Sequence, residues 1–193
     1  MDESRVPTGI DNLDNLIEGG IPRGSLVLLA GNPGTGKTVF SMQFLFKGAE
    51  DCGENGIYVS FAESEETIIH NMSKIFECDL KRKEFNGKVK ILDFTTVTEK
   101  GLGTLLEMIL EEVVALKAKR LVIDSFSAIA QAFKEPIEAR SVLHNILGKL
   151  VRSLGCTTIL IVEVPIGVEK IGVSVEEFVA DGVIILRRGN YNG

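Results

Sequence analysis

The stretch Ser25-Leu26-Val27-Leu28-Leu29-Ala30-Gly31-Asn32-Pro33-Gly34-Thr35-Gly36-Lys37-Thr38 decides the fold. It starts as an apolar run and continues as a complete Gly-x-x-x-x-Gly-Lys-Thr phosphate loop, Gly31 to Thr38, which leads into a helical pattern near Lys37. Glycines let the backbone turn its N–H groups inward, toward the positive end of a helix dipole. The stretch therefore predicts a strand, a polyphosphate-binding loop and a helix, in that order.

Two side chains of this loop have specific expected roles. Lys37 is expected to reach the β- and γ-phosphates as a point charge, which also makes it a catalytic candidate. The Thr38 hydroxyl is expected to bind a Mg²⁺ ion that bridges the same oxygens. The alternative is a glycine-rich turn that happens to precede a helix. The predicted nucleotide-binding residues are Gly31, Asn32, Pro33, Gly34, Thr35, Gly36, Lys37, Thr38 and Val39.

Apolar runs alternate with helical periodicities along most of the chain, which predicts an α/β fold: a mostly parallel central sheet with helices on both faces. The helices are expected after Ser64 as N-cap, over the apolar stripe 102–114, and from Pro136 to a stop at Gly155. The expected strands are Ser25 to Ala30, Ile57 to Phe61, Val89 to Leu92, Leu121 to Asp124, Thr158 to Val162 and Val183 to Leu186.

Length and composition limit the function further. A chain of 193 residues with 45% apolar and 25% charged residues suits one globular domain, 1–193. A net charge of −6 argues against nucleic acid as a standing partner. No run is long and apolar enough for a membrane span and the N-terminus does not resemble a signal peptide, so we expect a cytoplasmic protein. The three cysteines have no metal-ligand spacing.

Hydrolysis of a bound nucleotide needs carboxylates besides the loop. Asp124 ends the predicted strand Leu121 to Asp124, at the sheet edge where ligand crevices lie, and is expected to bind the metal, largely through its waters. Glu63 closes the second predicted strand and could orient the attacking water; a capping role beside Ser64 is the alternative. Glu163, at the end of the fifth strand, is a weaker candidate for sensing the γ-phosphate.

Three further segments carry a family resemblance: Val6 to Asp14, Gly19 to Gly24, and Val175 to Leu186. With the phosphate loop, they make the chain resemble the RecA superfamily, and within it the single-domain KaiC-like ATPases found widely in archaea. The resemblance covers essentially all 193 residues. It implies a three-layer RecA-like P-loop fold that binds ATP with Mg²⁺. It also implies a homo-oligomer, commonly a hexameric ring, with each nucleotide between neighbouring subunits.

The chain departs from the family pattern at three places. Ala62 stands where clock KaiC proteins have the first of two glutamates, so Glu63 is expected to act alone and hydrolysis could be slow. Glu177 and Phe178 replace a phosphorylatable Ser-Thr pair, so no autokinase or clock role is expected. Family members continue beyond the last strand with Lys and Arg that reach the neighbour's γ-phosphate, and that contribution is expected to be missing after Gly193.

Alternative functions follow from these departures. An ATP-dependent scaffold that recruits an unknown protein partner and hydrolyses little remains the runner-up. A recombinase-like DNA-binding ATPase is disfavoured, because the segment Val164 to Val175 contains only Lys170 as a cation. A small-molecule kinase is disfavoured because no Arg-rich lid is visible. The basic cluster Lys81-Arg82-Lys83 is interpreted as solvated, with a partner contact as the alternative.

Overall fold

A computed structural model describes residues 3–77, 87–96, 102–125, 148, 153–164 and 180–189 of the chain. Six strands form one sheet in the order β5-β4-β6-β7-β3-β8, and all its neighbouring strands run parallel. Each strand agrees with a predicted one to within one residue at either end. The strands are β3 (Leu26–Gly31), β4 (Gly56–Ser60), β5 (Val89–Asp93), β6 (Arg120–Asp124), β7 (Thr157–Glu163) and β8 (Gly182–Leu186).

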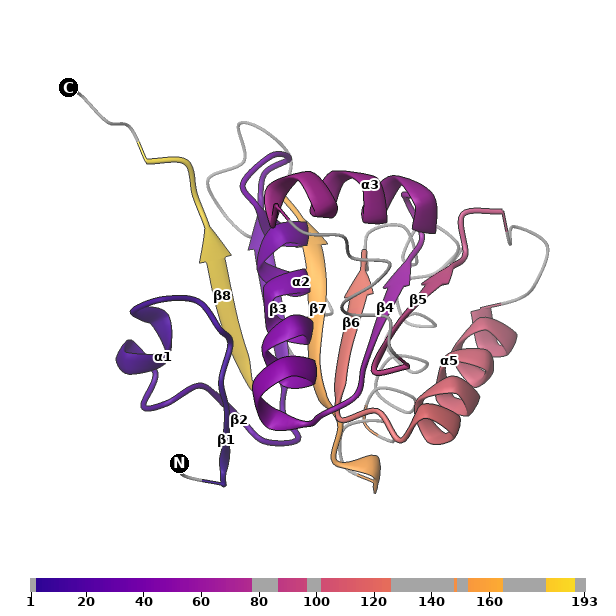
Figure 1. Cartoon of the computed structure of the whole chain (residues 1–193), viewed down its shortest axis with the longest axis horizontal. Coiled ribbons are helices and arrows are strands. Elements are labelled where there is room, and N and C mark those ends of the chain that lie inside the picture. The colour runs from indigo at the N-terminus through magenta and orange to yellow at the C-terminus, as the bar shows by residue number, and fades with distance from the viewer. Residues whose placement is uncertain are drawn as a thin grey trace.

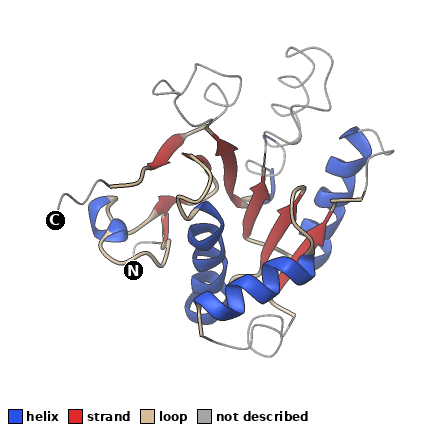
Figure 2. Cartoon of the chain, turned by 90° about the horizontal axis from the view of Figure 1, so that it is seen from above, coloured by secondary structure: helices blue, strands red, loops and turns tan. Residues whose placement is uncertain are grey.

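Helices cover both faces of this sheet, as predicted (Figure 1, Figure 2). In the five strands from β5 to β3, alternate residues belong to two separate hydrophobic clusters, whereas the edge strand β8 contributes to only one of them, because Val183 and Ile185 are exposed. Helix α2 (Lys37–Lys47), its π-helical extension η1 (Gly48–Cys52) and helix α3 (Glu65–Ile75) contribute to one cluster, and helix α5 (Leu102–Leu116) contributes to the other. Because successive strand side chains point to opposite faces, both faces of the sheet are buried except at the edge strand β8. The result is three layers.

Helix α3 begins where the sequence predicted. The side chain of Ser64 accepts a hydrogen bond from the Thr67 backbone N–H at 3.3 Å, and Glu65 and Glu66 occupy the first turn. A cap of this kind stabilises a helix by about 1 kcal/mol. It also fixes the short connection between β4 and α3, so the residues between them stay at the carboxyl edge of the sheet.

The N-terminal segment forms a small unit that the sequence analysis did not assign to strands. Strands β1 (Arg5–Val6) and β2 (Ile21–Pro22) pair antiparallel, with the short helix α1 (Leu13–Leu16) between them. The Asp14 carboxylate accepts hydrogen bonds from Thr8 N at 2.8 Å and Thr8 Oγ1 at 2.7 Å. Val6 and Ile21 join the same hydrophobic cluster as α2, so the segment is anchored to the phosphate-loop side of the sheet.

The family-like segment Val175 to Leu186 contains Asp181, which has a structural role at the start of β3. The Asp181 carboxylate accepts a hydrogen bond from the Leu26 backbone N–H at 2.8 Å. Strands β8 and β3 are thereby held in register before the phosphate loop begins. Several predictions lie outside the described residues: the helix from Pro136, the Lys81-Arg82-Lys83 cluster, Lys170, and the pair Glu177 and Phe178. Within the described ranges, no helix is both long and apolar enough to cross a membrane.

Candidate nucleotide-binding site

The phosphate loop joins β3 to α2 at the carboxyl edge of the sheet, toward which the arrowheads of β3, β6 and β7 point (Figure 1). A Cβ atom at Gly31 would lie 2.7 Å from the carbonyl oxygen of Leu186, so no side chain fits there. Gly36 caps α2 with φ at +91°, a conformation that glycine adopts without strain. The backbone path of the loop therefore requires glycine at Gly31 and favours it at Gly36.

Lys37 is the first residue of α2, and its amine lies inside the loop. Its Nζ atom donates to the carbonyl oxygens of Gly31 and Asn32, at 2.9 Å each, and the residue is only 7% exposed. The loop is braced from within by Thr35 Oγ1, which donates to Asn32 O at 2.8 Å, while Asn32 Nδ2 donates to Val164 O at 2.9 Å. The positive charge of Lys37 is thus held by the carbonyl groups of Gly31 and Asn32, at the place where phosphate oxygens are expected to bind.

Other predicted loop residues differ in how they face solvent. Pro33, Gly34 and Gly36 are exposed, which leaves the loop accessible. Val39 is half-buried, and its side chain packs against the hydrophobic cluster on the α2 side of the sheet. Arg188, which follows β8 and was not among the predicted site residues, also reaches the loop: one of its guanidinium nitrogens lies 2.8 Å from where a Gly34 Cβ would be.

Asp124 ends β6 and reaches the loop from two strands away, because β7 lies between β6 and β3. Its Oδ2 atom is 3.4 Å from Thr38 Oγ1 and accepts a short hydrogen bond from the Tyr58 hydroxyl. The structure therefore brings together the two predicted metal-binding residues. Tyr58, in the middle of β4, was not among the predicted site residues.

These donors fit a hard cation whose remaining ligands come from phosphate and water. Mg²⁺ is commonly held in phosphate sites by one or two protein oxygens only. One hydroxyl and one carboxylate at neighbouring positions satisfy that requirement. In the described part of the chain, no group of three or more His, Cys, Asp or Glu residues could hold a metal by itself.

The two remaining carboxylates lie at the same edge. Glu163 is the last residue of β7 and is in register with Gly31. Glu63 does not close a strand as expected: β4 ends at Ser60, and Glu63 lies in an exposed turn three residues later. Ser60 Oγ donates to Glu63 O at 2.6 Å and accepts from Glu63 N at 3.1 Å, which closes a turn directly after the strand.

A protein-family model described as "ATPase: KaiC" matches residues 6–193. The chain belongs to the KaiC family. Among curated relatives it is 35% identical to the "Circadian clock oscillator protein KaiC" of Prochlorococcus marinus, over 97% of this chain and 39% of that protein. It is 34% identical to a UPF0273 protein of Pyrococcus horikoshii, over 98% of this chain and 80% of the relative. A crystal structure of a KaiC-like protein from Pyrococcus horikoshii has a TM-score of 0.82 and 41% identity, covering 97% of this chain and 82% of that one.

The KaiC-family chain thus spans less than two-fifths of the clock proteins it matches, and about four-fifths of the archaeal relative and of the solved structure. The RecA-like fold expected from the resemblance is confirmed by the solved relative. The phosphate loop, Asp124 and all three family-like segments fall inside the matched range.

The electrostatics of the KaiC-family site centre on Asp124. Burial raises the pKa of Asp124; the hydrogen bond from Tyr58 and the charge of Lys37 oppose this shift, while the charges of Glu163 and Glu63 add to it. Burial also raises the pKa of Tyr58 well above its ordinary value, so its hydroxyl keeps its proton and donates. The site holds excess negative charge that a cation would compensate.

We expect Asp124→Asn to stabilise the nucleotide-free protein at pH 7 by about 1 kcal/mol, a usual size for a stabilising single substitution. Folding raises the pKa of Asp124 above its ordinary value of 3.8. At pH 7 the charged carboxylate therefore reduces the stability of the folded protein. This reduction is lost as the pH falls through the folded-state pKa toward 3.8, because the folded protein then takes up the proton. Urea unfolding of both proteins from pH 7 to pH 4 measures this. A variant less stable than the wild type at pH 7 would contradict the assignment.

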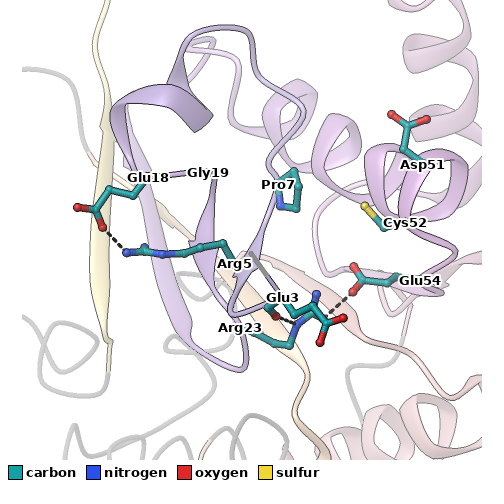
Figure 3. A pocket seen from close by; sticks show the side chains of 9 residues that line it. All are labelled: Glu3, Arg5, Pro7, Glu18, Gly19, Arg23, Asp51, Cys52 and Glu54. Carbon is teal, nitrogen blue, oxygen red and sulfur yellow. Dashed lines mark hydrogen bonds and ion pairs between the residues drawn. The ribbon is translucent and has the colours of Figure 1, made fainter. Parts of the chain in front are cut away.

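A pocket of about 370 Å³ lies away from the nucleotide site, at the amino ends of the strands (Figure 3). Two ion pairs lie in its lining, Arg5 with Glu18 and Arg23 with Glu54, each at 2.6 Å. Arg5 and Arg23 are thus already neutralised within the pocket wall. Nothing in the described part of the chain indicates a ligand for this pocket.

Proposed function

We propose that this KaiC-family domain binds ATP with Mg²⁺ and hydrolyses it to ADP and phosphate. One observation carries the proposal: Lys37 and Thr38, at the start of α2, lie at the carboxyl edge of the sheet together with Asp124, which ends β6. Membership of a family described as an ATPase supports it. The chemistry is the in-line attack of water on the γ-phosphate.

In this proposal each residue has one task. The backbone of the loop and the Lys37 amine bind the phosphates, and the amine exchanges its carbonyl partners for phosphate oxygens. Thr38 and Asp124 hold the metal, Asp124 largely through water. Bound Mg²⁺ neutralises charge that develops on the phosphate oxygens. Catalysis is then mostly positioning and electrostatic stabilisation by groups that are already in place.

Glu63 is the proposed base that orients the water. It belongs to the turn directly after β4, and Ser60 in that strand is in register with Asp124. Its negative charge is close enough to contribute to the raised pKa of Asp124. The hydrogen bonds of Ser60 fix the Glu63 backbone, so the carboxylate emerges from a fixed point beside the metal acid.

We expect Glu63→Gln to lower the rate of phosphate release by about 100-fold or more, the usual contribution of a general base, without weakening ATP binding. Glu66→Gln is the matched control, because Glu66 is an exposed glutamate in the first turn of α3. The measurement is phosphate release with saturating ATP and Mg²⁺, with binding of a fluorescent ATP analogue followed in parallel. Equal turnover in both variants would remove Glu63 from the mechanism.

A second candidate function is an ATP-dependent scaffold that hydrolyses little. The observation that favours it is the state of Glu63: among the described residues, hydrogen bonds fix its backbone but none fixes its carboxylate, and the side chain is exposed. A poorly held base gives slow hydrolysis. Tight Mg²⁺-dependent ATP binding without phosphate release in the wild type would favour this function over the first.

We also propose that the domain assembles as a homo-oligomer, a hexameric ring by family resemblance, with nucleotide between subunits. Light scattering with and without ATP tests this directly. The clock function printed in the names of the longer relatives is not carried over, because Glu177 and Phe178 are not phosphorylatable residues.

A further inference from the structure

Tyr58 joins the core of the sheet to the candidate metal site. It lies in the middle of β4, is fully buried, and belongs to the hydrophobic cluster beneath α2. Register pairs Tyr58 with Val122 and Ser60 with Asp124, so Tyr58 and Asp124 are diagonal neighbours on one face of the sheet. At this separation a long side chain reaches its neighbour, and the Tyr58 hydroxyl donates to Asp124 Oδ2.

The hydroxyl of Tyr58 is not needed to fill space. A phenylalanine ring would pack in the same volume, and a buried hydroxyl without a partner is unfavourable. What the tyrosine adds to the core is therefore one donor, directed at one carboxylate oxygen. That oxygen also lies 3.4 Å from Thr38 Oγ1, so hydroxyls from β4 and from α2 converge on the same atom of Asp124.

A carboxylate held in this way has a fixed orientation. Asp124 is otherwise free to rotate about its terminal side-chain torsion, which is a soft one. With Oδ2 engaged by Tyr58, the other carboxylate oxygen and the remaining lone pairs face a constant direction. Partners that hold a metal ligand in place commonly change metal affinity by about 10- to 100-fold when they are removed.

We propose that Tyr58 is a positioning residue that holds the Asp124 carboxylate ready for nucleotide-bound Mg²⁺. The inference rests on the proposed function, since it assigns the metal to Thr38 and Asp124. In this role Tyr58 contacts neither nucleotide nor metal. Its contribution appears only where the metal is present, which separates it from a residue that merely supports the fold.

The test compares wild type, Tyr58→Phe and Ser41→Ala for binding of a fluorescent ATP analogue, first in EDTA and then across a Mg²⁺ titration. Ser41→Ala is a matched control because it also removes one buried hydroxyl from the phosphate-loop side, and Ser41 Oγ has no hydrogen-bond partner in the described part of the chain. We expect Tyr58→Phe to keep the affinity measured in EDTA and to need about 10-fold more Mg²⁺ for half-maximal gain. Ser41→Ala is expected to behave as wild type in both conditions.

Three results would overturn the proposal, and they differ in what else they affect. If Tyr58→Phe requires the same Mg²⁺ concentration as wild type, Tyr58 does not position Asp124, while the proposed ATPase function stands. If Tyr58→Phe loses affinity equally in EDTA and in Mg²⁺, its role is only structural. If wild type gains no affinity from Mg²⁺, the metal site of the proposed function is itself wrong.

Discussion

Lys37→Ala is expected to weaken ATP binding on the order of 100-fold or more. The Lys37 amine is 7% exposed and donates to two loop carbonyls, so it is already placed and largely desolvated before the ligand arrives. Hydrogen bonds from charged donors contribute about 1.5–3 kcal/mol each, and two such bonds to phosphate account for the expected loss. Calorimetric titration with ATP measures it.

Lys47→Ala is the matched control for this prediction. Lys47 is the last residue of the same helix and pairs with Asp51 at 2.5 Å on an exposed surface. Exposed pairs of this kind contribute about 0.3–0.5 kcal/mol, so both stability and ATP binding should be nearly unchanged. If Lys37→Ala bound ATP as well as Lys47→Ala does, the loop would be only a turn before a helix.

Most of the sheet could be predicted because its strands are short, almost entirely apolar runs between turn residues. Such runs need both faces covered, which leads to a parallel sheet between helix layers. The antiparallel pair β1 and β2 escaped prediction because each strand has two residues, too few to show a period of two. Glu63 was expected to close β4 but lies in a turn after it, which the Ser60 side chain closes by hydrogen bonds, and an apolar pattern carries no information about such bonds.

The candidate site was predictable where a motif or a strand end carried the signal, as for Lys37, Thr38 and Asp124. Tyr58 was missed because a tyrosine in an apolar strand looks like any core aromatic residue, and only the diagonal register reveals its partner.

Arg120, at the start of β6, was missed for a related reason. A charged residue at the start of a strand is usually exposed. Arg120 is buried because it contacts the N-terminal segment, α2 and the residues around Glu54, which lie far from it in the sequence.

Arg120 is the first residue of β6, at the opposite end of that strand from Asp124, and it is completely buried. Its guanidinium donates to Glu54 Oε2 at 2.7 Å, to Pro7 O at 2.8 Å and to Phe44 O at 2.7 Å. It also lies over the Phe44 ring, 4.7 Å from the centroid. One side chain thus joins the N-terminal segment, the phosphate-loop helix and the sheet.

Arg120→Met is expected to lower the free energy of unfolding by about 3–5 kcal/mol, because it keeps much of the side-chain volume but leaves buried carbonyls and part of the Glu54 charge without a donor. Arg23→Met is the matched control. Arg23 pairs with the other oxygen of the same Glu54 at 2.6 Å, but its side chain is 40% exposed against 0% for Arg120. The control should cost about 1 kcal/mol or less. Urea unfolding of both variants at pH 7 measures the difference.

The Glu54 carboxylate allows the source of this stability to be separated into charge and packing. Burial by itself would raise the pKa of Glu54, but hydrogen bonds from Arg23 and Arg120 outweigh it and hold the pKa below its ordinary value of 4.5. The stability that the charged Glu54 carboxylate contributes is therefore fully present above pH 4.5, and it is lost as the pH falls through the lower folded-state pKa. Glu54→Gln should lack this acid-dependent loss, and combined with Arg120→Met it should recover part of the stability, since no uncompensated buried charge remains. If Arg120→Met and Arg23→Met cost the same, the burial of Arg120 does not make its ion pair more important than the exposed one. If the double variant recovers nothing, the loss in Arg120→Met comes from packing or from the unpaired carbonyls and not from the uncompensated charge of Glu54.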